Sequence, residues 1–322
     1  MRAACSRNGV GSVRRCEAVK IRAWRCTFSV AVALVASTIC MEGAGAKHNV
    51  ITGSAARAIK DVSLRSGPSA SYAVKARIPC GASVSIVSGP DESSWYKVKY
   101  GSTRGYIAGG YLTRRLARTV MQLSTSAKLV FLTFDAGSDT GYSRQILDTL
   151  RAKNAKASFG ITGEWANDNP ALVRRIVSDG HSLINHTYSH RSLTGFSTGT
   201  KALGYAVRRS ELASAESAVT RVSGESTKPY FRPPYGDYDS CALAHISHEG
   251  YRYNVLWSHD SLGWRGLTRK QIVQRVLAAL EPGAIYLFHV GGKSHDGRAL
   301  PQIVDELRAR GYTFARIADH YR

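Results

Sequence analysis

The pattern of apolar and polar positions changes character along the chain. Between residues 58 and 112, apolar and polar positions alternate over short runs that Gly, Pro and Ser separate. Alternation with a period of two predicts β-strands, and closely spaced turns predict a small barrel. We expect the clearest strands at residues 62–65, 84–87 and 95–100.

From residue 128, short apolar runs typical of buried strands alternate with segments in which apolar residues recur at helical spacing. The continuous apolar run 129–134 predicts a buried parallel strand, and Pro170 suits the first turn of a helix. Repeated strand-then-helix order predicts a parallel sheet, open or closed into a barrel. Further strands are expected at 157–161, 182–184, 255–257 and 284–288, and further helices at 205–222, at 269–280 and from Pro301.

The first 46 residues have the pattern of an export signal. An Arg-rich start precedes the apolar run 28–40, and Ala44-Gly45-Ala46 forms a small-x-small cleavage pattern. The apolar run is too short for an ordinary transmembrane helix. We therefore expect a signal over residues 1–46 and a secreted or cell-wall-associated protein, with an uncleaved membrane anchor as the alternative.

The charge balance indicates an anionic target. The 322-residue chain carries 44 Lys and Arg against 23 Asp and Glu, a net charge of +21. The basic residues are scattered along the chain without a long Lys/Arg run, so a nucleic-acid partner is not expected. We expect instead that the protein binds an anionic cell wall or membrane surface. No stable protein partner is predicted.

Cysteine usage leaves little room for a disulfide framework. Four of the six cysteines fall in the expected signal, and only Cys80 and Cys241 remain. They are expected in different domains, so two unpaired cysteines are favoured, with a bridge between them as the alternative.

Ionisable side chains lie at five predicted strand ends or loops of the second half. Because ligands bind at the carboxyl ends of parallel strands, we expect these groups on one face. Each alone has an ordinary structural explanation, such as a helix cap or a salt bridge, and the joint pattern is what favours a site. The groups are Asp135, His186 with His190 four residues on, Arg232, Asp260 and His289.

These residue types fit metal-assisted hydrolysis. Two imidazoles four residues apart, His186 and His190, can hold zinc or a similar divalent ion together with oxygen ligands. Such an ion lowers the pKa of bound water and polarises a carbonyl. Asp135 could then take the proton of the water, and His289 could protonate a leaving nitrogen.

Two further charged residues could set the charge state of the proposed base Asp135 and the proposed acid His289. Arg232 could pair with Asp135 and hold it ionised, and Asp260 could orient or charge His289 in the same manner.

The ordered set resembles the polysaccharide deacetylases, the NodB-homology carbohydrate esterases of family 4, over about residues 128–322. The resemblance implies a distorted (β/α) barrel that removes acetyl groups from N-acetylated sugars. It makes Asp135 the general base, His186 and His190 metal ligands, and His289 the general acid. It implies that Arg232 steadies the base, that Tyr235 lends its backbone N–H to the oxyanion, that Trp264 lines the acetyl pocket, and that Asp260 and Leu287 belong to the last two motifs.

Two positions depart from the family pattern. Ala136 stands where the family carries an Asp that is the third metal ligand, so either Asp139 or water is expected to replace it. Zinc is the expected metal, with cobalt, nickel or manganese as alternatives. Gly263 stands where the fourth motif carries its second Asp.

The first part of the chain resembles a bacterial SH3-like domain over about residues 56–114, followed by a linker at 115–127. That resemblance implies peptidoglycan binding, with a spacer role as the alternative. It rests on residues 64–69, 95–98, 105–107 and 111–112.

Together these features predict a metal-dependent enzyme that removes N-acetyl groups from cell-wall polysaccharide, with GlcNAc or MurNAc of peptidoglycan favoured. The alternatives are a catalytically impaired wall-binding protein, a deacetylase of chitin-type oligosaccharides, and a different metallohydrolase such as a peptidase.

Overall fold

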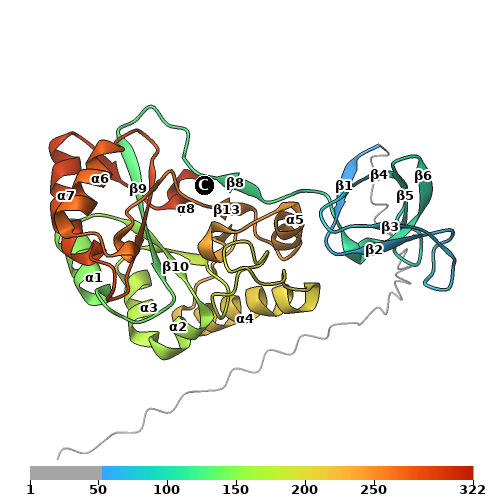
Figure 1. The fold of residues 1–322 in the computed structure, drawn as a ribbon, viewed down its shortest axis with the longest axis horizontal. Coiled ribbons are helices and arrows are strands. Elements are labelled where there is room, and N and C mark those ends of the chain that lie inside the picture. The colour runs from blue at the N-terminus through green and yellow to red at the C-terminus, as the bar shows by residue number, and fades with distance from the viewer. Residues whose placement is uncertain (1–52, 322) are drawn as a thin grey trace, which may run out of the picture. The chain divides into compact units, whose positions relative to one another are not determined.

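A computed structural model describes residues 53–321 (Figure 1). The expected signal at residues 1–46, with its four cysteines, lies outside the described residues. Within the described range, none of the helices combines the length and apolar character needed to cross a membrane.

The first part is an antiparallel sheet with strand order β3-β2-β6-β5-β4-β1-β7. Alternate side chains such as Leu64, Ile86 and Val98 are buried in one small core, as the period of two predicts. The strands are β1 (Ala55–Ala58), β2 (Val62–Arg65), β3 (Val74–Ile78), β4 (Ser83–Ser88), β5 (Trp95–Tyr100), β6 (Thr103–Ala108) and β7 (Leu112–Thr113).

The second part is built on a curled parallel sheet with strand order β14-β15-β9-β10-β11-β12-β13-β8, and β16 also pairs with β9. The central strand β9 is buried along nearly its whole length, which explains its continuous apolar run. The strands are β8 (Arg118–Val120), β9 (Leu129–Ala136), β10 (Ala157–Ile161), β11 (Ser182–Asn185), β12 (Tyr230–Phe231), β13 (Tyr253–Val255), β14 (His259–Asp260), β15 (Ile285–His289) and β16 (Thr313–Phe314).

Helices follow the strands and bury their apolar faces against this sheet. Figure 1 shows α1, α6 and α7 together on one flank, where their apolar residues share a core with β9, β10 and β15. The helices are α1 (Ser143–Ala152), α2 (Gly163–Asp168), α3 (Pro170–Ser178), α4 (Tyr205–Ser223), α5 (Ser240–His248), α6 (Arg269–Ala278), α7 (Asp296–Ala309) and α8 (Ile317–His320). The expected fold class, a distorted (β/α) barrel preceded by a small all-β barrel, is confirmed.

Two boundaries differ from the sequence prediction. The strand expected at 255–257 is β13 at Tyr253–Val255, because its polar first residues pair with β12 and β8. The helix expected to begin at Pro301 is α7, which begins at Asp296, so Pro301 lies inside it rather than at its start. As the sixth residue of α7, Pro301 removes one backbone hydrogen bond and crowds the carbonyl of the preceding turn. The helix continues through it because the neighbouring Leu300 and Ile303 are fully buried in the core.

Cys80 and Cys241 form a disulfide, contrary to the expectation that these two residues stay unpaired. Cys80 follows β3 and Cys241 lies in α5, so the bridge spans 161 residues of sequence. Local sequence cannot reveal such a pairing because it depends on how distant segments meet in the folded chain.

Candidate active site

The carboxyl edge of the parallel sheet gathers the predicted residues. Parallel register places His289 of β15 beside Asp135 of β9, while His186 and Arg232 directly follow β11 and β12. A cleft of about 760 Å³ opens at this edge. Of the ten predicted site residues, nine line it: Asp135, Asp139, His186, His190, Tyr235, Asp260, Trp264, Leu287 and His289.

The tenth, Arg232, lies fully buried beneath the cleft and pairs with Asp135. Its Nη1 donates to Asp135 Oδ1 at 2.8 Å, while Nε and Nη2 donate to the carbonyls of Val255 and Leu256. Burial alone would raise the pKa of Asp135, but Arg232 and the nearby imidazoles of His186 and His289 lower it below its usual value. The carboxylate is therefore ionised, as a proton acceptor must be.

The two imidazoles that follow β11 are neutral. His186 Nδ1 donates to the carbonyl of Arg232 at 2.8 Å, which leaves the Nε2 lone pair free 3.5 Å from Asp135 Oδ2. Burial lowers the pKa of His186, and it lowers that of His190 to about 4. The two rings lie 4.8 Å apart between centroids. Neutral imidazoles with one nitrogen fixed by a carbonyl have the form that metal-ligating histidines take.

The side chains at the cleft provide some, but not all, of the ligands that a divalent ion needs. Ala136 is buried in the apolar core and offers no ligand atom. Asp139 lines the cleft, but its Oδ1 accepts from the backbone N–H of Gly292 at 2.6 Å. Over residues 53–321, the His, Cys, Asp and Glu side chains form no group of three that could hold a metal ion. Two imidazoles thus fit the expected ion, and its third ligand remains a prediction.

Asp260 makes its hydrogen bonds to the loop that follows it. Its Oδ1 accepts from Leu262 N at 2.8 Å and its Oδ2 from Trp264 Nε1 at 3.1 Å. The carboxylate thereby fixes the Trp264 indole at the cleft. The carboxylate that contacts His289 is a residue that the sequence did not point to, Asp296, which accepts from the backbone N–H of His289 at 2.8 Å.

Unusual backbone conformations concentrate around the cleft. Of six non-glycine residues with positive φ in the described chain, four lie at or beside it. Residues other than glycine rarely adopt a positive φ, because the Cβ atom clashes with the backbone. Such strain persists where surrounding contacts enforce a functional geometry. The four are Thr187 (φ 63°), His190 (φ 58°), Tyr235 (φ 62°) and Leu262 (φ 54°).

A residue that the sequence did not indicate holds the loop along one wall of the cleft. Asp237 is buried and accepts from Ser192 Oγ, Ser197 N and Ser197 Oγ. These bonds fasten the loop after His190, which carries the 68% exposed ring of Phe196 next to the cleft-lining Ser197. The local sequence does not link Asp237 to this loop, because Ser197 and Asp237 are 40 residues apart in the chain.

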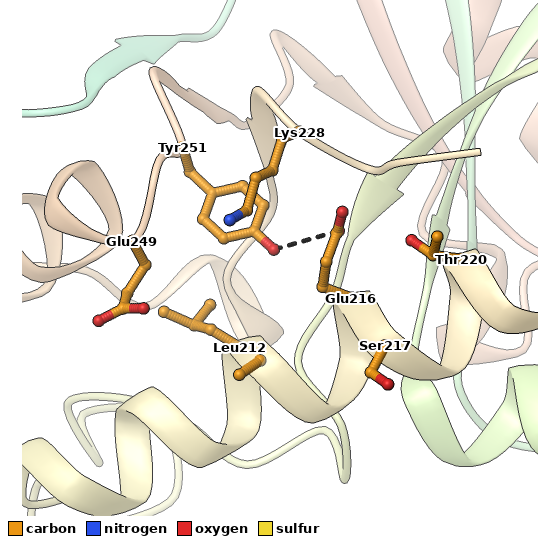
Figure 2. A pocket seen from close by; sticks show the side chains of 8 residues that line it. Leu212, Glu216, Ser217, Thr220, Lys228, Glu249 and Tyr251 are labelled. Atoms are coloured by element: carbon orange, nitrogen blue, oxygen red, sulfur yellow. Dashed lines mark hydrogen bonds between the residues drawn. The ribbon is translucent and has the colours of Figure 1, made fainter. Parts of the chain in front are cut away.

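A second, smaller pocket of about 360 Å³ lies beside α4 (Figure 2). Its Glu216 carboxylate accepts from the hydroxyl of Tyr251 at 3.4 Å and from Ser226 and Thr227. The ammonium of Lys228 lies over the Tyr251 ring. The polar side chains here already have hydrogen-bond or cation–π partners within the protein. We therefore attribute the pocket to the packing of the loop between α4 and β12.

Comparisons with known proteins match both parts of the chain. The sequence profile named Polysaccharide deacetylase matches residues 122–254, and that named Bacterial SH3 domain matches residues 60–113. The chitooligosaccharide deacetylase of Sinorhizobium fredii is 33% identical over 174 residues, 54% of this chain and 77% of that protein. A structure described as a family 4 pseudoenzyme from Bacillus anthracis has a TM-score of 0.57 at 22% identity, covers 64% of this chain and 69% of its own, and is similar in fold alone.

The peptidoglycan-N-acetylmuramic acid deacetylase PdaA of Bacillus subtilis is 31% identical over 199 residues, 61% of this chain and 72% of PdaA. Its solved structure, described as a family 4 carbohydrate esterase, has a TM-score of 0.57 at 29% identity and covers 63% of this chain and 84% of its own. The chain belongs to the polysaccharide deacetylases, the carbohydrate esterases of family 4, and carries a bacterial SH3 domain ahead of the deacetylase domain.

Proposed function

We propose that this enzyme hydrolyses the N-acetyl groups of peptidoglycan sugars, GlcNAc or MurNAc, at the cleft of the parallel sheet. The observation that carries the proposal is the ionised carboxylate of Asp135, held by the buried Arg232 next to two neutral imidazoles. An ionised base beside a pair of metal-ligand histidines suits attack of water on an amide carbonyl.

Each residue at the cleft has a separate role in the proposed hydrolysis. Asp135 accepts a proton from the attacking water, and His289 protonates the nitrogen as it leaves the acyl carbon. The backbone N–H of Tyr235 donates to the developing oxyanion, while Trp264 and Leu287 enclose the acetyl methyl.

The family is metal-dependent in general, and we propose zinc here, with cobalt, nickel or manganese able to replace it. When bound, the ion lowers the pKa of water and polarises the acyl oxygen. His186 and His190 would hold it, and Asp139 or water would complete its ligands.

Three features support a cell-wall target outside the cytoplasm. The chain without residues 1–46 keeps 37 basic against 21 acidic residues, a net charge of +16 that suits an anionic polymer. The SH3 domain is proposed to bind peptidoglycan. The disulfide between Cys80 and Cys241 suits an oxidising compartment, which agrees with export by the first 46 residues.

The test is acetate release from purified peptidoglycan. We expect the enzyme to release acetate, Asp135→Asn to release almost none, and removal of metal by a chelator to stop release until zinc is added back. Reduced-end sugar analysis after digestion then identifies GlcNAc or MurNAc as the deacetylated residue, and chitin oligosaccharides serve as the competing substrate. Acetate release that persists after complete metal removal would contradict the metal mechanism.

A second candidate is a wall-binding protein without catalysis, which the replacement of the third ligand by Ala136 favours. It predicts that the protein sediments with peptidoglycan and releases no acetate with any divalent metal. The retained pair of Asp135 and Arg232 argues against it, because burying an ion pair is costly and a binding surface has no need of one beneath it.

A further inference from the structure

A buried carboxylate next to His289 is used by none of the steps above. Asp296 opens α7 and is 0% exposed. Its Oδ2 accepts from the backbone N–H of His289 at 2.8 Å and from Ser294 Oγ at 2.7 Å. Its Oδ1 is buried and has no hydrogen-bond partner among the described residues, and the same holds for His289 Nδ1.

Two buried, unsatisfied atoms on adjacent side chains are costly when left apart. One is a carboxylate oxygen, which accepts, and the other is an imidazole nitrogen, which donates when protonated. A hydrogen bond from Nδ1–H to Oδ1 would satisfy both atoms at once. It also leaves Nε2 of His289 as the ring nitrogen available to the cleft that His289 lines.

We propose that Asp296 is the positioning residue of His289, with its carboxylate holding the imidazole through Nδ1–H so that Nε2 delivers the proton to the leaving nitrogen. The proposal rests on the proposed amide hydrolysis. It assigns to Asp296 the role for which the sequence suggested Asp260, whose carboxylate instead bonds Leu262 and Trp264.

The space around Gly263 supports the assignment. A Cβ at position 263 would lie 2.4 Å from Asp296 Oδ1 and 2.5 Å from Ser294 Oγ. A side chain at 263 and the carboxylate of Asp296 therefore exclude each other. The departure of position 263 from the family pattern now has a physical account, since the acid reaches the same space from α7.

The charges around His289 leave Asp296 as its partner. His186 and His190 are neutral, and Asp135 is already paired with Arg232, whereas Asp296 has no cationic side chain bound to it in the described part of the chain. Burial raises the pKa of Asp296, and its hydrogen bonds together with the His289 charge oppose that rise. The groups that face His289 are Asp135 on β9, His186 and His190 after β11, and Asp296 on α7, while Asp139, Asp260 and Lys293 line the same cleft.

The experiment follows the imidazole itself rather than activity alone. The pKa of His289 is measured by NMR on the histidine-labelled full-length chain as purified, with the signal assigned by its loss in His289→Gln. We expect Asp296→Asn to lower this pKa by about one unit or more, because the carboxylate no longer stabilises the imidazolium. The matched control Asp305→Asn removes an exposed carboxylate from the same helix and should change nothing.

A compensating variant guards against a folding defect. Asp296→Ala should lower the pKa of His289, and adding Gly263→Asp should return a carboxylate to the vacated space and raise the pKa again. An equal His289 pKa in wild type, Asp296→Asn and Asp296→Ala would overturn the proposal, and so would a double variant that titrates as Asp296→Ala does.

Kinetics then separates this proposal from the proposed function. If wild type releases acetate, the alkaline limb of kcat should move to lower pH in Asp296→Asn by the same amount as the NMR pKa, with KM little changed. An unmoved limb would overturn the positioning role. If wild type releases no acetate, the proposed function fails, and the NMR comparison still decides whether Asp296 holds His289.

Discussion

At the scale of single residues, the site depends on one buried ion pair. Arg232 satisfies Asp135 and two main-chain carbonyls at once, so its guanidinium is fully used without any contact with solvent. Such a pair adds little net stability over an apolar pair, yet removing one partner leaves an uncompensated buried charge. The pair is therefore a sensitive point of both stability and catalysis.

Arg232→Met is expected to lower the free energy of unfolding by about 3–5 kcal/mol, because Asp135 and the carbonyls of Val255 and Leu256 lose their partner. The measurement is urea unfolding followed by the far-UV helical signal. All α-helices of the described chain lie beyond residue 142, so this signal reports the deacetylase domain. The exposed pair of Arg310 and Glu306 is the control, and Arg310→Met should cost no more than about 1 kcal/mol. Similar losses in the two variants would contradict the account.

Metal binding also belongs to this scale. His186→Gln and His190→Gln should each lower the zinc content of the purified protein well below that of wild type, measured by mass spectrometry of the metal. His248→Gln, which changes an exposed histidine, should not. Asp139→Asn separates the two expectations for the third ligand, since a lowered zinc content supports Asp139 and an unchanged content supports water.

At the scale of elements, the parallel register of the strands brings most of the site residues together. Each strand ends at the same edge, so residues from Asp135 to His289 converge although their positions span 155 residues of sequence. The loop between β11 and α4 is different, because no regular element holds it. The buried carboxylate of Asp237 fixes it from the neighbouring loop.

Asp237→Asn should therefore loosen residues 192–200 without unfolding the sheet, with a loss of about 2 kcal/mol of local protection against hydrogen exchange. Burial raises the pKa of Asp237, but the hydrogen bonds from Ser192 and Ser197 lower it to below its usual value. A depressed pKa contributes stability above the unfolded value of about 3.9, and that stability is lost as pH falls through the folded pKa.

Protection of this loop in wild type, corrected for intrinsic exchange, should thus fall as the pH drops below about 4 and stay flat in Asp237→Asn. Asp239→Ala is the control, because it removes the side chain that caps α5 two residues further on. It should loosen α5 and leave residues 192–200 protected. Equal loosening of the loop in both variants would argue against the role of Asp237.

At the scale of the whole molecule, the disulfide joins distant segments of the chain. Cys80 lies among the strands of the SH3 domain, and Cys241 lies in α5 of the deacetylase domain. A long closed loop restricts the unfolded chain, which is the main source of disulfide stabilisation in the chain-entropy account.

The variant with both Cys80→Ser and Cys241→Ser should lose about 2–4 kcal/mol in unfolding free energy. Wild type in a reducing agent should behave like this variant, which separates the bridge from the packing of the side chains. Peptide mapping without reduction should show the two cysteines in one cross-linked peptide pair. Free thiols at both positions in protein isolated from an oxidising compartment would contradict the bridge.

The sequence by itself determined the order of the elements and the fold class, because both follow from periodicity along the chain. It also identified the chemical groups, since Asp135, the histidine pair and His289 stand at strand ends that meet in any parallel sheet. The start of α7 was misplaced because Pro301 is a strong local signal that packing of the helix overrides.

Only the tertiary structure decided which side chains act on one another. It joined Cys80 to Cys241, assigned Asp260 to the Trp264 loop, and brought Asp296 from α7 to His289 through the space left open at Gly263. Pairings of this kind depend on the burial and spacing of groups far apart in sequence. Periodicity places a residue on an edge of the sheet, but three-dimensional packing selects its partner.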